Sequence, residues 1–72
     1  MPPLPVVTGR QCVAALERAG FTVRRQSGSH IIMSRPGSPV LSIPNHNPIK
    51  RGTLRAIIRD AGLTVDEFIA LL

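Results

Sequence analysis

The 72-residue chain has no tryptophan, no tyrosine and only two phenylalanines, so it lacks the aromatic platform on which sequence-reading RNA domains stack bases. Its one cysteine, Cys12, cannot form an internal disulfide, which is typical of a reducing cytoplasm. No apolar run approaches the roughly 18 residues that a membrane span needs, and Met1 to Pro5 carry no charge ahead of an apolar stretch. We therefore expect neither a membrane segment nor a signal peptide.

Acidic residues are also scarce, since four Asp and Glu stand against nine Lys and Arg and leave a net charge of +5. So much positive charge on a small chain favours a polyanionic partner, which is nucleic acid, an acidic protein or an anionic membrane. The hydrophobic content of 43% indicates a folded chain, and the length allows one small core. We expect a single domain over residues 1–72, in which residues 1–7 form an extended, proline-rich arm.

Local signals in the first two thirds of the chain predict one helix and three strands. Thr8 and Gln11 form a capping-box pattern ahead of a helix over about residues 9–19, which Gly20 ends. The period of the apolar residues then changes to two, and short turns join the strands into an antiparallel meander. The strands are expected at about residues 21–26, 29–34 and 40–43.

Two further helices are expected after the strands. Thr53 is the expected N-cap of a helix that ends at Gly62. Thr64 and Glu67 form a second capping-box pattern ahead of a short last helix. The order helix, three strands, helix, short helix predicts an α+β fold, with the helices on one face of a three-stranded antiparallel sheet.

The apolar alternation of the second strand predicts which of its residues face the helices. Ile31 and Met33 form the more apolar set, so we expect them to point at the core. This leaves His30 on the open face, near Thr22 or Arg24 of the first strand.

Positive side chains gather on the second helix and the first strand. Those on the helix recur every four residues along one face, with only Asp60 near enough to relieve their repulsion. Such a run is usually a solvated helix face, but repeated like charges cost stability and so favour a partner that gains from them. We expect six side chains to bind the phosphates of a nucleic acid: Arg24, Arg25, Lys50, Arg51, Arg55 and Arg59.

The two histidines are the candidates for proton transfer. Imidazole titrates near neutrality, so His30 can move a proton without a metal, with Arg24, Arg25 and Arg35 on neighbouring segments to hold a phosphodiester. By itself, however, a lone strand histidine is more often structural. His46 is either a second proton donor or an ordinary loop residue. The histidines, the cysteine and the carboxylates lack the spacing of a zinc or two-cation site, so no metal and no cofactor are expected.

Four blocks of the sequence carry a further signal: Gly20–Phe21, Arg25–His30, Ile43–His46 and Gly52–Leu63. In this order and spacing they resemble the HicA toxins of bacterial and archaeal HicAB toxin–antitoxin pairs, over roughly residues 8–69. The resemblance implies a double-stranded-RNA-binding-domain-like fold and endoribonuclease activity on messenger RNA, with His30 as the catalytic residue. It also implies inactivation by a HicB antitoxin whose domain covers the catalytic surface.

These observations lead to a hypothesis of a cytoplasmic, metal-independent endoribonuclease toxin. In this hypothesis His30 takes the proton from a ribose 2′-OH, which attacks the adjacent phosphate, while arginines stabilise the added negative charge. One alternative is a non-catalytic module that binds double-stranded RNA through the same basic residues. Another is an interaction protein that docks an acidic partner. RNA cleavage distinguishes the first reading from the other two, and a steep loss of RNA affinity with salt distinguishes RNA binding from protein docking.

Overall fold

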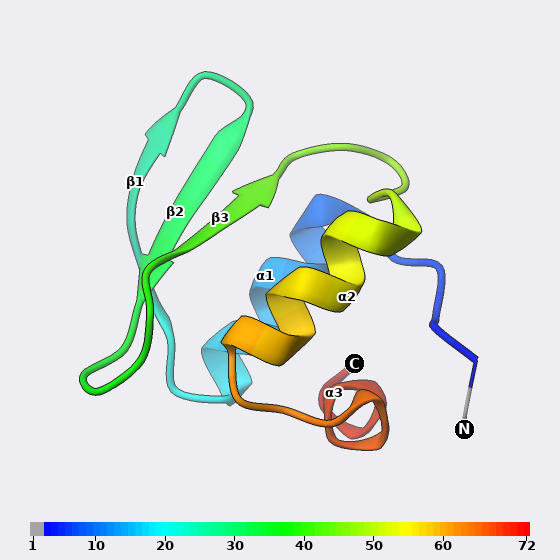
Figure 1. Cartoon of the computed structure of the whole chain (residues 1–72). Coiled ribbons are helices and arrows are strands. Elements are labelled where there is room, and N and C mark those ends of the chain that lie inside the picture. Colours follow the sequence, from blue (N-terminus) through cyan, green and yellow to red (C-terminus); the bar gives the residue numbers. More distant parts are fainter. Residues whose placement is uncertain (1–2) are drawn as a thin grey trace.

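The computed structural model describes residues 3–72 and shows one helix, a three-stranded sheet and two further helices in that order (Figure 1). The elements are α1 (Gly9–Arg18), β1 (Thr22–Ser27), β2 (His30–Ser34), β3 (Leu41–Pro44), α2 (Arg51–Asp60) and α3 (Val65–Leu71). The expected α+β order is thereby confirmed. No helix within residues 3–72 is long and apolar enough to cross a membrane.

Side-chain caps begin α1 and α3, as their sequences predicted. The amide of Gln11 donates to Thr8 Oγ1 at 3.1 Å, and the amide of Thr8 donates to Gln11 Oε1 at 2.8 Å. Thr64 and Glu67 repeat the same two bonds at the start of α3. Each pair satisfies two backbone donors that the first turn leaves without a partner inside the helix.

The start of α2 differs from the expectation. The helix begins at Arg51, after an N-cap Lys50 whose side chain makes no capping bond, so the expected N-cap at Thr53 is wrong. Ile49 is buried, and its amide donates to the carbonyl of Val7 at 2.9 Å. The segment ahead of α2 is thus held by the N-terminal residues, and this tertiary contact sets the start of the helix.

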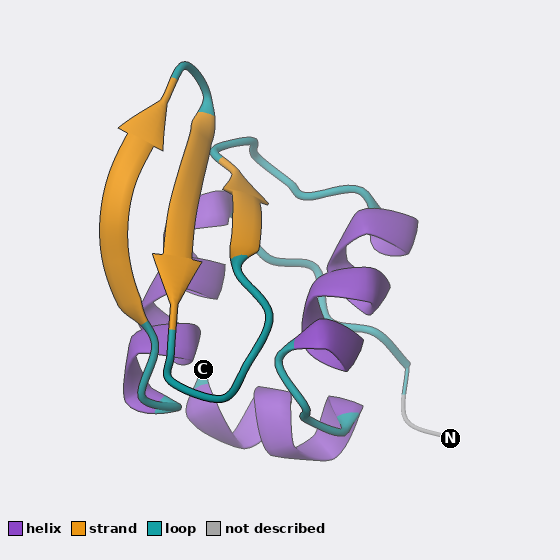
Figure 2. Cartoon of the chain, turned by 60° about the vertical axis from the view of Figure 1, so that its left-hand side comes forward, coloured by secondary structure: helices purple, strands orange, loops and turns teal. Residues whose placement is uncertain are grey.

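The sheet has the order β1-β2-β3 with antiparallel neighbours, and the helices cover one of its faces (Figure 2). Met33, Leu41 and Ile43 point into the core and are at most 2% exposed, while Ile31 packs against them. This confirms the predicted inward face. No helix within residues 3–72 covers the opposite face, and Val40, at the approach to β3, is 67% exposed.

A β-bulge in β1 changes which side chains of this strand lie on the open face of the sheet. Val23 pairs with Met33 and Arg25 with Ile32, which leaves Arg24 as an extra residue between them. Arg25 therefore shares the open face with Ile32. Arg24 lies on that face as well, because its Nε donates to Ser34 Oγ at 2.7 Å. Strict alternation would have turned one of the two arginines inward.

The N-terminal segment contributes to the core. Residues 3–7 form neither helix nor strand, as expected, but Leu4 and Val7 are buried in the hydrophobic core. Met1 and Pro2, which belong to the expected arm, lie outside the described residues. The arm is therefore packed along the part that the structure describes.

Arg35 has a structural role rather than the phosphate contact that was expected of it. Its guanidinium donates to the carbonyl of Ala19 at 2.7 Å and to the carbonyl of Ala61 at 3.0 Å, which are the C-caps of α1 and α2. The same group lies 4.3 Å from the centre of the Phe21 ring. Arg35 thus ties two helix ends to the sheet and is not free to hold a phosphodiester beside His30.

Candidate functional site

One surface pocket contains both histidines of the chain. It has a volume of about 290 Å³ and is open to solvent between β2, the end of β3 and the start of α2. We call it the histidine pocket, and its lining residues are His30, Ser42, Pro44, His46, Lys50 and Thr53. His30 and His46, which are separated in the sequence by the rest of β2, one loop and β3, are thereby placed around one space.

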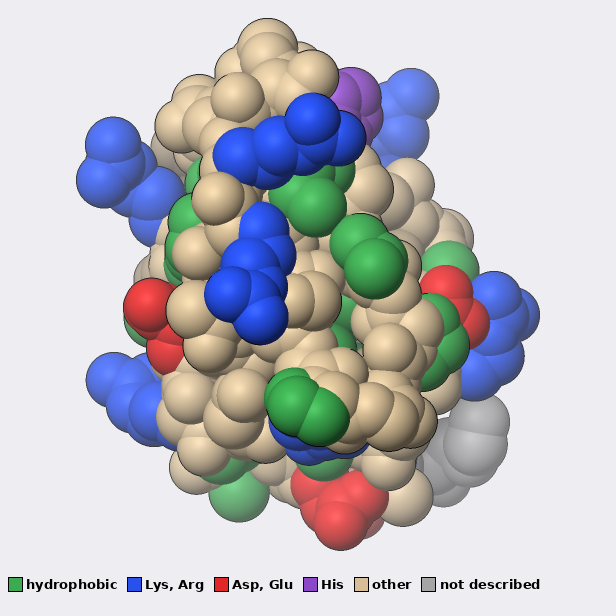
Figure 3. Space-filling view, turned by 90° about the vertical axis from the view of Figure 1, so that its left-hand side faces the viewer, with side chains coloured by type: hydrophobic (Ala, Val, Ile, Leu, Met, Phe, Trp, Pro, Cys, Tyr) green, Lys and Arg blue, Asp and Glu red, His purple; other side chains and the backbone are tan. Residues whose placement is uncertain are grey.

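His30 is held at the first position of β2. Gly28, with a φ of +59°, allows the tight turn between β1 and β2. Antiparallel pairing then sets His30 between Ser27 on β1 and Pro44 on β3. The His30 side chain is exposed, and the open face to which it belongs carries Lys and Arg side chains among hydrophobic ones, with a histidine at the edge of the view (Figure 3).

The predicted neighbours of His30 are wrong. Thr22 pairs with Ser34, which is four residues from His30 and so roughly 13 Å away along the strand at about 3.3 Å per residue. Arg24 is bonded to that same Ser34. The hairpin register, which pairs His30 with Ser27, moves both residues to the far end of the sheet.

Positive charge nonetheless reaches the histidine pocket. Lys50 is one of its lining residues, and Arg25 lies opposite Ile32, two residues along the sheet from His30. The first turn of α2 has no acidic residue, and no side chain caps its free amides. Because the N-terminus of a helix carries partial positive charge, Lys50 and Arg51 are unfavourable there unless an anion is nearby.

The loop that carries His46 packs directly on the start of α1. The amide of Gly9 donates to the carbonyl of His46 at 2.8 Å. A Cβ at position 9 would lie 2.5 Å from the carbonyl oxygen of Pro44 and 2.8 Å from the Cα of Asn45. Only glycine permits this approach, so Gly9 is a positioning residue that the sequence reasoning missed. The sequence did contain a signal for this role, because Gly9 stands in the first turn of a predicted helix, where glycine lowers helix propensity.

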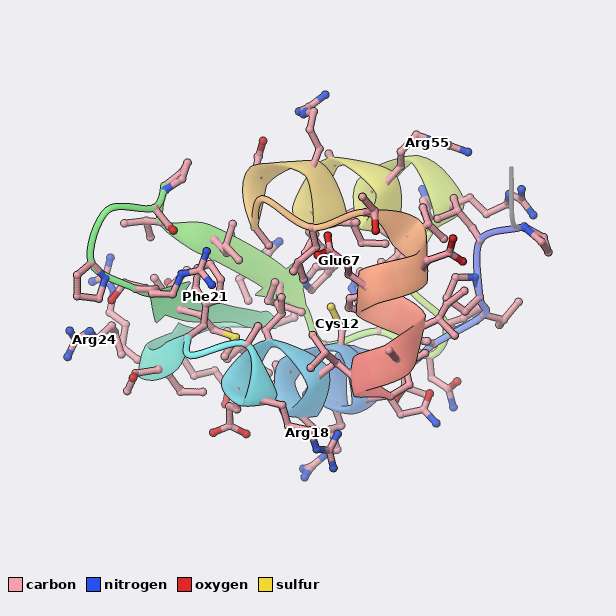
Figure 4. All side chains as sticks on the ribbon, turned by 90° about the horizontal axis from the view of Figure 1, so that it is seen from below. Cys12, Arg18, Phe21, Arg24, Arg55 and Glu67 are labelled. Carbon is pink, nitrogen blue, oxygen red and sulfur yellow. The ribbon has the colours of Figure 1, made fainter. Side chains whose placement is uncertain are left out.

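The arginines of α2 are exposed, as expected, but they do not join the histidine pocket. Thr53 marks the flank of α2 that faces the pocket, and Arg55 lies about 160° around the helix from it at 100° per residue. Figure 4 shows Arg55 pointing away from the sheet, with Arg24 on the opposite side of the view. Arg59 Nε lies 3.3 Å from Asp60 Oδ1 in an exposed pair. The cations thus occupy two separate surfaces.

Two other kinds of group could carry chemistry, which are a cluster of metal-ligating side chains and the thiol of Cys12. Within residues 3–72 no three His, Cys, Asp or Glu side chains lie together in a way that could hold a metal ion. The Cys12 side chain is fully buried, and this burial raises the pKa of its thiol to about 12, so it stays neutral and unreactive at physiological pH. Neither group adds a reactive centre to the histidine pocket.

Comparison with known proteins identifies a related family. The family model described as the HicA toxin of bacterial toxin–antitoxin systems matches residues 9–63. The match includes the sheet, α1, α2 and all six residues that line the histidine pocket. No curated protein matches the chain.

Proposed function

Because this chain belongs to the HicA toxin family of bacterial toxin–antitoxin systems, which implies an antitoxin partner, we propose that it is an endoribonuclease that cleaves messenger RNA in the cytoplasm. The observation that carries this proposal is the convergence of His30, His46 and Lys50 on one pocket. Cleavage of RNA by its own 2′-OH uses a general base, a general acid and positive charge at the phosphate, and two imidazoles and an ammonium group can supply them.

In the proposed mechanism each histidine moves one proton. His30 accepts the proton of the ribose 2′-OH as O2′ forms a bond to phosphorus. His46, in its protonated form, donates a proton to O5′ as the P–O5′ bond breaks. The products are a 2′,3′-cyclic phosphate and a free 5′-OH. Since the two imidazoles supply both proton transfers, the reaction needs no metal ion, and each group contributes about 10²–10⁴-fold to the rate.

The positive groups have distinct parts in this proposal. Lys50 lies in the histidine pocket and stabilises the extra negative charge on the phosphate as O2′ attacks. Arg25 and Arg24, on the open face of the sheet, bind the RNA backbone further from the cut. Arg51, Arg55 and Arg59 bind phosphates on the other surface, along the outer flank of α2.

The test is cleavage of a purified RNA in excess EDTA, followed on a gel. We expect cleavage to persist, the products to carry a 2′,3′-cyclic phosphate, and a substrate with one 2′-deoxy residue at the cut to resist. His30→Ala and His46→Ala should each lower the rate by about 10²–10⁴-fold without unfolding the protein, because both side chains are exposed.

Ser27→Ala is the matched control, since Ser27 lies opposite His30 but outside the histidine pocket. It should cut RNA at the parent rate. Activity that disappears in EDTA and returns with magnesium would overturn the mechanism, as would a His30→Ala protein that cuts like the parent. RNA binding without any cleavage would instead support the alternative, a module that binds double-stranded RNA.

We further propose that the partner is a HicB-type antitoxin that covers the open face of the sheet. Val40 is 67% exposed and Ile32 half-buried on that face, among positive side chains, which suits a protein partner with an apolar and acidic surface. Val40→Asp and Ile32→Asp should weaken the toxin–antitoxin complex in a pull-down, and His30→Ala should not. Ile69→Asp, on the exposed side of α3, is the control. A complex unaffected by both sheet variants would place the antitoxin elsewhere.

A further inference from the structure

A second groove continues from the histidine pocket along β3. We call it the β3–α2 groove, and it has a volume of about 530 Å³. Its lining residues are Val40, Leu41, Ser42, Gly52, Thr53, Ala56, Ile57 and Asp60. Ser42 and Thr53 also line the histidine pocket, so the two spaces adjoin.

The two spaces differ in charge. No carboxylate is among the described residues that line the histidine pocket, where Lys50 and two histidines lie. In the β3–α2 groove the only charged residue among the described lining is Asp60, and the other residues are apolar or carry a hydroxyl. A phosphate would be repelled by Asp60, whereas an uncharged, flat group fits between apolar walls.

Asp60 is not explained by the stability of α2. It is the last residue of the helix, where a negative charge opposes the helix dipole. Its ion pair with Arg59 is exposed on both sides, and pairs of this kind contribute little.

Gly52 is likewise not required by the fold. A Cβ added there would meet nothing within 4 Å, and its backbone conformation is one that any residue adopts. A glycine in a helix lowers stability, and one benefit that can offset this cost is close approach of a ligand to the backbone. Because Gly52 has no side chain, it leaves room in the β3–α2 groove beside the histidine pocket.

On the basis of the proposed function, we propose that the β3–α2 groove holds the nucleobase next to the cleaved phosphodiester in single-stranded RNA. Asp60 lies seven residues, roughly 10 Å, along α2 from Thr53, which leaves room for a ribose and a base between the histidine pocket and the carboxylate. The Asp60 carboxylate accepts a hydrogen bond from an exocyclic amino group, so adenine, cytosine and guanine are preferred over uracil. A base in this groove cannot be paired, so the substrate is single-stranded at the cut.

The test uses a set of short RNAs that differ only in one nucleotide on either side of the cut, including an abasic one. We expect the parent protein to cut the amino-bearing bases roughly tenfold faster than uracil at one of the two positions. Asp60→Asn should bring this ratio close to one, because an amide can donate to uracil O4 as well as accept. Asp66→Asn on α3 makes the same change in charge away from the groove and should keep the parent ratio.

Ala56→Leu tests whether a base occupies the β3–α2 groove. Ala56 is half-buried on the wall of the groove, and a leucine there fills the volume that the base would occupy. The variant should cut the abasic and the base-containing RNA at equal rates, while the parent should cut the abasic RNA more slowly. Thermal unfolding followed by circular dichroism shows whether the variant remains folded.

The outcomes separate this inference from the proposed function. A parent protein that cuts RNA with no base dependence at either position overturns the inference and leaves the endoribonuclease intact. If no RNA is cut, the proposed function fails, and fluorescence anisotropy with the same RNAs tests the groove by binding. Equal affinity for amino-bearing bases and uracil then overturns the inference. Variants of Asp60 and Ala56 that weaken only the antitoxin complex would show a protein-binding groove, which also overturns it.

Discussion

Gly9→Ala is the change that tests most directly how the histidine pocket is held together. The new methyl group would stand 2.5 Å from the carbonyl oxygen of Pro44, 2.8 Å from the Cα of Asn45 and 3.3 Å from the amide nitrogen of His46. All three are backbone atoms, which cannot rotate away as a flexible side chain can. Either α1 or the loop must therefore move, and the 2.8 Å bond from the Gly9 amide to the His46 carbonyl is the first contact to be lost.

The cost can be estimated from these contacts. Crowding in a packed region costs about 1–3 kcal/mol, and the lost backbone hydrogen bond adds about 1 kcal/mol. Alanine regains about 1 kcal/mol through its higher helix propensity. The net loss is about 1–3 kcal/mol, whereas a 72-residue domain has a total stability of about 4–11 kcal/mol. The variant should therefore fold, with a melting temperature lower by about 4–8 °C for each kcal/mol lost.

The cleavage rate should fall by more than the loss of folding stability alone would cause. Displacement of the loop moves His46 relative to His30, so the cleavage rate at saturating RNA should drop while RNA affinity changes little. Urea denaturation measures the loss of stability. Single-turnover cleavage measures the loss of activity, and the NMR signals of the histidines report the displacement of His46. Gly52→Ala makes the same chemical change in the first turn of α2, where the added methyl meets nothing within 4 Å, and should melt at or above the parent temperature. A Gly9→Ala protein with parent stability and unshifted His46 signals would show that Gly9 does not position the loop.

The remaining predictions concern the buried thiol, the contacts of Arg35 and the arginines of α2. Burial raises the pKa of the Cys12 thiol from 9.0 to about 12. The unfolded chain therefore ionises first, so the free energy of unfolding should fall between about pH 9 and pH 12 by up to about 4 kcal/mol. Cys12→Ala should remove this part of the pH dependence, and an identical slope in both proteins would contradict it. Arg35→Ala should lower the free energy of unfolding by about 2–4 kcal/mol, because two helix-end carbonyls lose a charged donor. An unchanged urea midpoint would contradict this role. Replacing both Arg55 and Arg59 with Ala should flatten the salt dependence of RNA affinity by about one unit per lost phosphate contact, with the saturated cleavage rate unchanged. A lower saturated rate would instead mean that these arginines act at the cut.

Much of the fold could be predicted because its signals are local. The Thr8–Gln11 and Thr64–Glu67 caps each act within one turn of helix, and both form as their sequences indicate. The strands of the meander follow from apolar alternation over a few residues. The start of α2 could not be predicted in this way, because it depends on the burial of Ile49 and its bond to Val7, far away in the chain.

The candidate site was only partly within reach of the sequence. Both histidines were recognised from their residue type, and the resemblance singled out His30. Their meeting in one pocket depends on the register that pairs His30 with Pro44, and a register belongs to two strands at once. The extra residue Arg24 in β1 likewise changed which cations share the open face.

The element types, the inward face of the sheet, the excess of positive charge and the family could all be read from the order and kinds of amino acids. These properties are set by neighbouring residues or by composition, and no folding is needed to read them. The folded chain was needed to place His46 and Lys50 around the same pocket as His30, to connect Arg35 to two helix ends, and to bring Gly9 against the loop that carries His46. Each of these depends on the close approach of segments that are distant along the chain, and such an approach is defined by packing and strand register.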